Sequence, residues 1–326
     1  MSAVLKLTDL QVHHDTARGA LRAVDGISLE IARGETLGLV GESGCGKSTL
    51  ARCVTGIDKP NGGSVEIEGV TAGRGKAARL QRARNVQMIF QDPSGALNPR
   101  LQVERIITEP LSVAGEESRS AHRTRAIETA RKVGLSDYHL ERMPHELSGG
   151  QRQRVSIARA LVLNPNLLVC DEAVSALDVS VQAQVLNLLL DIQKELGLSY
   201  LFISHDLAVV RYISHRIAVM YLGRIVEIGA AEDVWASRLH PYTQALIHSI
   251  PEEAAKTGRT VTLEGDVPSP VNPPSGCAFR TRCPFARAAC AEARPELRAV
   301  GSHEVACHFA EEIAAGSGAE PERAHG

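Results

Sequence analysis

Two stretches near the start of the chain alternate apolar and polar residues. They read VLKLTDLQV (4–12) and GISLEI (26–31), and the polar segment HHDTARGALR lies between them. A period of two is typical of half-buried strands, because successive side chains of a strand point to opposite faces. The pattern predicts an antiparallel sheet over residues 4–31.

Four later stretches are short and almost wholly apolar. They are TLGLVG (36–41), VQMIF (86–90), LLVC (167–170) and YLFIS (200–204). Strands of a parallel sheet have this composition, because helices cover both faces of the sheet. A helix-compatible segment, 47–56, follows the first stretch across a glycine-rich loop. These features predict an α/β fold.

Helical composition marks two further regions. Residues of about 92–165 are rich in Arg, Ala, Glu and Leu, which predicts an inserted α-helical subdomain. After the LLVC strand, apolar residues recur at steps of three and four, which places one apolar stripe on a helix. The stripe consists of Val181, Val185, Leu188, Leu189, Ile192 and Leu196.

The periodic pattern weakens after residue 250, so we expect the main domain to cover residues 1–250. The proline-rich segment DVPSPVNPPSG (266–276) is typical of a linker. Four cysteines follow it, and we expect a small C-terminal extension over 251–310. The last residues, 311–326, are rich in Ala, Gly and Glu and are predicted to form a disordered tail.

Charge and composition argue against two classes of protein. Lys and Arg number 36 against 38 Asp and Glu, so no global basic field draws the chain to nucleic acid. No run reaches about 18 apolar residues and no secretory pattern is present, which predicts a cytosolic chain that does not span the membrane. In a reducing cytosol, clustered thiols among the seven cysteines favour a metal or cluster site over disulfides.

The segment GESGCGKST (41–49) matches the phosphate-binding pattern G-x-x-x-x-G-K-[ST] between a predicted strand and a predicted helix. Glycines let backbone N–H groups point inward, the helix dipole adds positive potential, and Lys47 supplies a full charge. The Ser48 hydroxyl is a candidate Mg²⁺ ligand. A glycine-rich turn without a ligand is the alternative. We predict that the phosphates of a bound nucleotide contact Gly41, Ser43, Gly44, Cys45, Gly46, Lys47, Ser48 and Thr49.

Two acids end the stretch LLVCDE, and they are Asp171 and Glu172. At the carboxyl end of a buried strand, Asp171 can hold Mg²⁺ through water, while Glu172 orients or deprotonates the attacking water. A solvated acidic pair is the alternative. The phosphate loop upstream favours the catalytic interpretation.

Further motifs identify the class of protein. They are ELSGGQRQRVSIARAL (146–161), Gln91 in IFQDP, SALD (175–178) and His205 in ISHD. Together with the phosphate loop, they resemble the nucleotide-binding subunits of ABC transporters over about residues 4–235. The resemblance implies an α/β fold of the P-loop NTPase class, an ABC-type nucleotide-binding domain with an antiparallel β subdomain and an inserted α-helical subdomain.

The resemblance also implies roles for single residues. Gln91 would sense the γ-phosphate and Mg²⁺ and link them to a membrane partner, His205 would contact the γ-phosphate, and Asp178 would act across a dimer interface. Taken alone, such residues are typical of a solvated loop or a helix start. In a head-to-tail dimer, the nucleotide of the other subunit would be bound by Ser148, Gly149, Gly150 and Gln151.

Longer motifs resemble the oligopeptide and dipeptide import branch, which includes nickel and glutathione importers. They are IFQDPSGALNPR, CDEAVSALDVSVQAQVLNLL, ISHDLAVVRYISHRIAVMYLGRIVE and HPYTQAL. The branch implies an ATPase that powers peptide import at the cytoplasmic face of the inner membrane. Its direct partners would be a second, related ATP-binding subunit in a heterodimer and two transmembrane permease subunits, which would meet residues 91 to about 108. An extracytoplasmic solute-binding protein would be an indirect partner. Import of nickel, glutathione or another small solute, a soluble non-transport ABC ATPase, and a non-hydrolysing partner subunit are the alternatives.

Two positions depart from the family pattern. Ala173 stands where a proline usually follows the catalytic glutamate, which affects local stiffness more than chemistry. Where the family commonly stacks an aromatic ring on adenine, the nearest residues are His13 and His14. An imidazole can stack, so His14 is the candidate, and a polar loop histidine is the alternative.

Four cysteines lie close together near the end of the chain, with the spacing C-x5-C-x6-C-x16-C. Structural zinc sites usually show shorter gaps, whereas an iron–sulfur cluster tolerates longer loops and one familiar pattern ends in Cys-Pro. The resemblance to peptide-import ATPases implies a [4Fe–4S] cluster, with zinc, reduced thiols or occasional bridges as alternatives, and His303 or His308 could replace a ligand. The predicted cluster ligands are Cys277, Cys283, Cys290 and Cys307.

Overall fold

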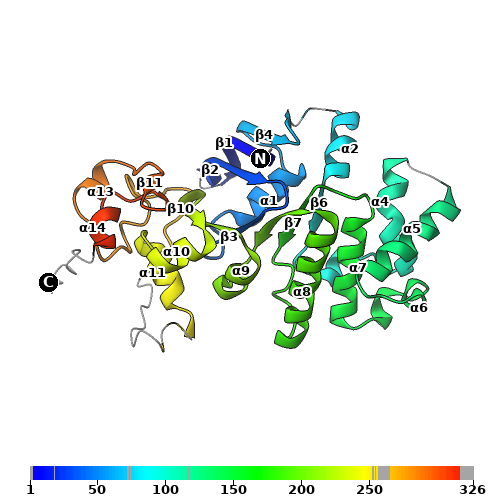
Figure 1. Cartoon of the computed structure of the whole chain (residues 1–326). Coiled ribbons are helices and arrows are strands. Elements are labelled where there is room, and N and C mark those ends of the chain that lie inside the picture. Colours follow the sequence, from blue (N-terminus) through cyan, green and yellow to red (C-terminus); the bar gives the residue numbers. More distant parts are fainter. Residues whose placement is uncertain are drawn as a thin grey trace.

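The computed structural model describes residues 3–17, 19–71, 73, 75–115, 118–251, 253, 255 and 265–315. An eight-stranded sheet runs through it in the order β11-β12-β10-β9-β3-β8-β7-β6 (Figure 1). The four neighbours β3, β8, β7 and β6 are parallel, and they coincide with the four apolar stretches of the sequence. Their bounds are Thr36–Val40, Ser199–Ile203, Leu167–Asp171 and Val86–Ile89.

A second sheet has four strands in the order β2-β1-β4-β5. The pairing of β1 with β2 is antiparallel, which confirms the prediction for residues 4–31. The inward side chains of this sheet pack on helix α1, whose other side meets the main sheet. The bounds are β1 Ala3–Thr16, β2 Gly19–Ala32, β4 Gly62–Ile67, β5 Val70–Thr71 and α1 Lys47–Thr55.

Every element that the structure describes between residues 92 and 165 is helical, as the composition predicts (Figure 1). Helix α8 (Val179–Leu196) carries the predicted stripe: Val185, Leu189 and Ile192 are fully buried, and Leu186 joins them. The helices are α3 Pro93–Ala96, α4 Val103–Ala114, α5 Arg119–Lys132, α6 Asp137–Leu140, the 3₁₀ turn η1 Pro144–Glu146 and α7 Gly149–Leu161, and α2 Lys76–Asn85 precedes them.

The C-terminal extension joins the main sheet. Strand β12 pairs with β10, with Glu227 opposite Val305, and β11 pairs with β12. Helix α14 forms where the sequence predicts a disordered tail, so that prediction is wrong for residues 311–314; residues 316–326 lie outside the described part. The bounds are α9 Leu207–Ile213, β9 Arg216–Tyr221, β10 Arg224–Ala230, α10 Ala231–Ser237, α11 Pro241–His248, α13 Ala289–Glu292, β11 Arg298–Val300, β12 His303–Val305 and α14 Ala310–Ala314.

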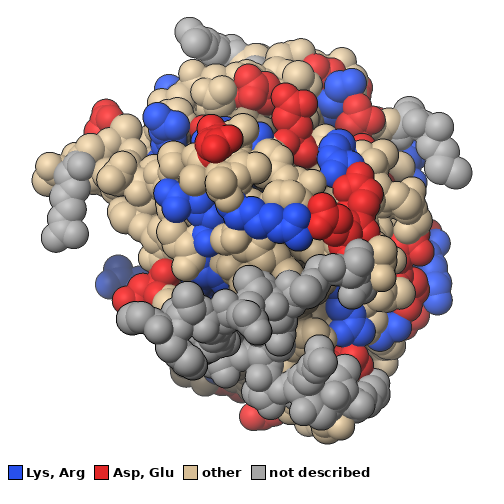
Figure 2. Space-filling view, turned by 90° about the vertical axis from the view of Figure 1, so that its left-hand side faces the viewer, with Lys and Arg blue, Asp and Glu red and all other residues tan. Residues whose placement is uncertain are grey.

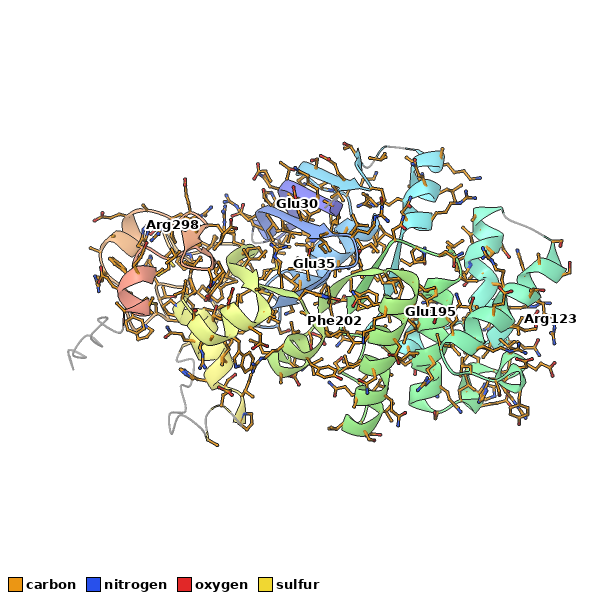
Figure 3. All side chains as sticks on the ribbon, in the orientation of Figure 1. Glu30, Glu35, Arg123, Glu195, Phe202 and Arg298 are labelled. Carbon is orange, nitrogen blue, oxygen red and sulfur yellow. The ribbon has the colours of Figure 1, made fainter. Side chains whose placement is uncertain are left out.

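Charged groups are mixed on the outer face of the extension. Figure 2 shows a short row of basic groups there beside acidic ones, not a field of one sign. Arg298 lies on the extension and pairs with Glu311 at 2.7 Å, while Arg123 lies at the opposite end of the molecule and pairs with Glu104 (Figure 3). Within the described residues, no helix is both long and apolar enough to cross a bilayer.

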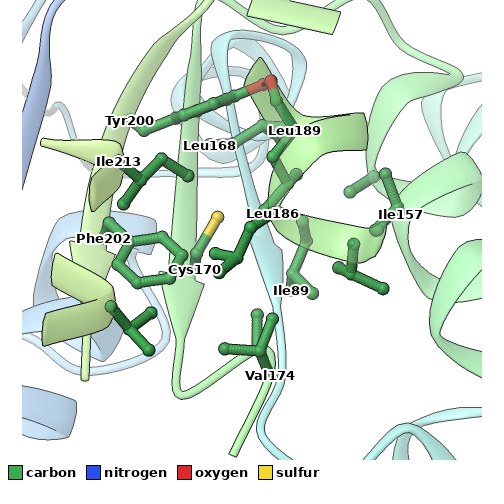
Figure 4. Close-up of a cluster of buried hydrophobic side chains, with 14 of the residues drawn as sticks. Ile89, Ile157, Leu168, Cys170, Val174, Leu186, Leu189, Tyr200, Phe202 and Ile213 are labelled. Carbon is green, nitrogen blue, oxygen red and sulfur yellow. Dashed lines mark hydrogen bonds between the residues drawn. The ribbon is translucent and has the colours of Figure 1, made fainter. Parts of the chain in front are cut away.

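Helices cover the second face of the main sheet. Side chains of β7 alternate between the two cores, with Leu167 and Val169 facing α1 and Leu168 and Cys170 facing the other side. Figure 4 shows this other core, where Leu168 and Cys170 meet residues of α7, α8 and α9. Burial on both faces explains why these strands read as continuous apolar runs.

Candidate functional site: the phosphate loop and the strand ends that face it

The phosphate loop, residues 41–48, joins β3 to α1 and depends on its glycines. The backbone of Gly41 has φ 155° and that of Gly46 has φ 109°, values that side chains rarely allow. A Cβ on Gly46 would lie 1.9 Å from the carbonyl oxygen of Ala23, and one on Gly41 would lie 2.2 Å from that of Met220. The loop therefore curls against β2 and β9 as only glycine permits.

Lys47 begins α1 and is 6% exposed. Its ammonium donates to the carbonyl oxygens of Gly41 at 2.7 Å and Glu42 at 2.9 Å. The cation thus lies inside the curl of the loop, next to the positive end of the helix dipole. Both favour a bound phosphate.

A serine and an aspartate meet opposite the loop. The Ser48 hydroxyl donates to Oδ1 of Asp171 at 3.1 Å, which joins the start of α1 to the end of β7. Burial raises the pKa of the Asp171 carboxyl above its usual value, against the effect of the Ser48 hydrogen bond. Hydroxyl and carboxylate oxygens are the ligands that Mg²⁺ prefers, and a bound cation would favour the charged form of the carboxylate. These two groups fit a Mg²⁺ site.

Three side chains converge beside this pair, each from the carboxyl end of a different parallel strand. Gln91 Nε2 donates to Oε2 of Glu172 at 2.9 Å, and His205 Nδ1 lies 3.5 Å from Oε1 of Glu172. Glu172 has a left-handed backbone, φ 48°, and its N–H donates to the Ile203 carbonyl at 2.9 Å. Strained backbone held in this way is common at functional sites.

Residues 148–151 and Asp178, which are expected to act across a dimer interface, have a different environment. Ser148 is exposed and caps α7, with its hydroxyl accepting from Gln151 N–H at 3.2 Å and its own N–H donating to the Gln151 side chain at 2.9 Å. Gly149 and Gly150 are half-buried, and Asp178, at the start of α8, is exposed. Within the described part of the chain, no hydrogen bond joins this segment to the phosphate loop. It faces outward, where another chain can reach it.

His14 is exposed on β1, opposite Leu21. In the described residues it makes no hydrogen bond to the phosphate loop. Its stacking on adenine stays a prediction.

The four clustered cysteines line one small cavity of about 20 Å³. Burial raises the pKa of the Cys283 thiol to about 12 and that of Cys307 to about 11. Although the four converge, no set of three or more His, Cys, Asp or Glu side chains among the described residues is arranged to hold a metal ion.

The two histidines proposed as substitute ligands differ in position. His303 is fully buried and bonds to Oε1 of Glu227 at 2.7 Å, so its suggested role at the cysteine cavity is wrong. His308 does line the cavity, and its Nε2 bonds to the Ala293 carbonyl at 2.9 Å.

The sequence did not reveal two residues that touch the phosphate loop. Tyr242 accepts a hydrogen bond from Glu42 N–H at 2.7 Å, and Arg282 pairs with both carboxylate oxygens of Glu42, at 2.6 and 3.0 Å. Both lie inside quoted motifs, HPYTQAL and the cysteine segment. Their spacing alone does not link them to a loop 200 residues or more away.

The loop curled around a lysine, the serine–aspartate pair and the glutamate beside them define a P-loop nucleotide hydrolase. Comparison with known protein families narrows this class. The ABC transporter family matches residues 24–175, and the family described as "Oligopeptide/dipeptide transporter, C-terminal region" matches residues 226–290. The chain belongs to the ATP-binding proteins of ABC transporters that carry this C-terminal region, which confirms the resemblance seen in the sequence.

Individual relatives extend over nearly the whole chain. The oligopeptide transport ATP-binding protein OppF of Salmonella typhimurium is 49% identical over 318 residues, covering 93% of this chain and 95% of that protein. The di/tripeptide transport ATP-binding protein DppF of Pseudomonas aeruginosa is 46% identical, covering 96% of this chain and 99% of that protein.

Solved structures confirm the cassette fold. The cbiO1 protein of Clostridium perfringens, part of an ABC transporter complex, is 26% identical with a TM-score of 0.66, covering 79% of this chain and 100% of that one. A dimeric bacterial ABC transporter cassette, MJ0796, is 28% identical with a TM-score of 0.64, covering 70% and 98%.

Proposed function

We propose that this chain hydrolyses ATP to power the import of peptides across a membrane. The observation that carries the ATPase part is the meeting of Gln91, Glu172 and His205 at the strand ends beside the Ser48–Asp171 pair. The peptide part is supported by the C-terminal region and by relatives whose names specify oligopeptide and di/tripeptide transport.

In the proposed reaction, the loop amides and Lys47 hold the β and γ phosphates. Bound Mg²⁺, held by Ser48 and through water by Asp171, would supply positive charge to the phosphates. Glu172 orients the attacking water and accepts its proton, and its hydrogen bond from Gln91 and contact with His205 fix the carboxylate. Hydrolysis then depends mainly on positioning and charge.

A second ATP-binding subunit would complete the site. The exposure of Ser148 and Asp178 supports a head-to-tail pair in which Ser148, Gly149, Gly150 and Gln151 contact the nucleotide of the other subunit. We propose that the partner is a related but different chain, that both dock on two permease subunits at the cytoplasmic face of the inner membrane, and that a solute-binding protein delivers the peptide.

Transport in reconstituted vesicles tests this proposal. The complete complex should accumulate a labelled oligopeptide only with Mg–ATP, and Lys47→Ala should abolish both ATP hydrolysis and accumulation, because it removes the only full positive charge that the loop offers the phosphates. Peptide-independent accumulation of nickel or glutathione would contradict the proposed solute, and ATP-independent peptide uptake would contradict the proposed coupling.

We also propose that Cys277, Cys283, Cys290 and Cys307 hold a [4Fe–4S] cluster, with zinc as the alternative. All four thiols line one cavity, and four thiolates are the usual ligands of such a cluster. The side chains would have to turn toward a common centre to bind it, because their arrangement among the described residues is not that of a metal site. Anaerobic purification should give a brown protein with iron and sulfide near four per chain, and treatment with a chelator and oxidant should bleach it. Stoichiometric zinc without iron, or a colourless metal-free chain, would contradict the cluster.

A further inference from the structure

Two side chains from a distant part of the chain, together with the lysine of the loop itself, hold one residue of the phosphate loop, Glu42. Its N–H donates to the Tyr242 hydroxyl at 2.7 Å, and its carboxylate accepts two hydrogen bonds from Arg282 at 2.6 and 3.0 Å. Its carbonyl oxygen accepts from Lys47 at 2.9 Å. The N–H group, the carbonyl oxygen and the carboxylate of Glu42 therefore each have a fixed partner.

The two groups from the C-terminal region are themselves held firmly. The Tyr242 ring is fully buried and packs against Tyr221, with centroids 4.7 Å apart, and against Phe279 at 5.4 Å. The Arg282 side chain is 3% exposed, compared with 24% for Glu42. A buried guanidinium that binds a carboxylate with two parallel hydrogen bonds fixes orientation as well as distance.

Fixing Glu42 fixes the catalytic lysine indirectly. Lys47 Nζ binds the carbonyl oxygens of Gly41 and Glu42, so the direction of the Glu42 carbonyl determines where the ammonium lies. The Glu42 N–H group also belongs to the backbone that curls around the phosphates. A shift of this one peptide would therefore disturb both the amide array and the lysine.

We propose that Arg282 and Tyr242 are positioning residues for ATP binding, through which the C-terminal region holds the phosphate loop in its receptive shape. The inference rests on the proposed function, since it concerns the affinity of the same loop for ATP. It gives this region a role in nucleotide binding by its own subunit.

Arg282→Gln in the full-length chain tests the inference. It removes the charged fork and leaves the Glu42 carboxylate without its partner. The Kd for Mg–ATP, measured by titration with a fluorescent ATP analogue, should rise about tenfold, equivalent to about 1.4 kcal/mol. In the assembled transporter, KM for ATP should rise by the same factor, while kcat at saturating ATP stays within about twofold. The reason is that the phosphates are bound more weakly to the same extent in the ground state and in the transition state, which raises KM and leaves kcat unchanged.

Two further variants separate positioning from general stability. Arg282→Lys keeps the charge without the fork and should recover part of the affinity. Arg280→Gln is the matched control, because that guanidinium binds Ser275, and its Kd and KM should equal those of the wild type. A melting temperature that falls in Arg282→Gln with unchanged Kd and KM, or a loss confined to kcat, would overturn the proposal.

If Arg282→Gln does not fold, Tyr242→Phe decides. It removes only the hydroxyl that accepts from Glu42 N–H, and Kd should rise about threefold, as expected for one neutral hydrogen bond; an unchanged Kd would overturn the inference. Wild-type protein that fails to bind ATP would contradict the proposed function itself, whereas wild-type binding with no effect of these variants contradicts only the role of the C-terminal region.

Discussion

At the level of single residues, the backbone conformation places the side chains of the candidate site. Glu172 adopts a left-handed conformation, φ 48°, directly after a buried strand, and its carboxylate thereby reaches both Gln91 and His205. Gly46 adopts φ 109° in contact with the Ala23 carbonyl. The motif predicts the glycine, because its pattern is defined by fixed residue types. It does not predict the conformation of Glu172, because no residue type marks such strain in a glutamate.

Gly46→Ala should damage nucleotide binding and folding together. The new Cβ would meet the Ala23 carbonyl oxygen at 1.9 Å, so β2 or the loop must move. Urea unfolding should show a loss of more than about 2 kcal/mol, and ATP binding should be undetectable by titration. Gly34→Ala is the control: its φ is also positive, at 77°, but the space around the Cβ is open, and it should cost only about 1 kcal/mol with normal ATP affinity. Equal effects of the two changes would show that the close contact does not matter.

The buried parallel strands and the longer helices can be predicted from the sequence, whereas the short strands of the extension cannot. The parallel strands can be predicted because both of their faces are buried and most of their residues are apolar. Strands β11 and β12 have three residues each, too few to show a period of two. They form because β10 offers an open edge, a feature of the assembled sheet and not of the local residues.

Phe279 connects the extension to the core and should contribute strongly to stability. Its ring is 1% exposed and meets Tyr221 edge to face, with centroids 5.3 Å apart, as well as Tyr242. Phe279→Ala leaves a cavity in this aromatic cluster and should lower the free energy of unfolding by about 3–5 kcal/mol in urea titrations. Tyr138→Ala, at a ring that is 64% exposed, should change it by less than about 1 kcal/mol. A small effect at Phe279 would mean that the extension is not packed onto the core.

Across the whole molecule, some contacts between distant segments can be predicted from the sequence and others cannot. Gln91, Glu172 and His205 could be predicted to meet, because each follows a strand of one parallel sheet and the carboxyl ends share an edge. Arg282 and Glu42 lie 240 residues apart, on elements whose relative position depends on how the extension folds back. Since Arg282 directly precedes Cys283, the cysteine cavity and the phosphate loop are supported by one short backbone segment.

Single-turnover hydrolysis by the Glu172→Gln variant, in the assembled complex with Mg–ATP, tests most directly that this chain is an ATPase whose water is activated by Glu172. Glutamine keeps the hydrogen-bonding shape but cannot accept the proton. The rate should fall at least about 100-fold while the Kd for ATP stays within about twofold of the wild type. A variant that hydrolyses ATP at the wild-type rate, or that loses ATP binding altogether, would contradict the role assigned to this carboxylate.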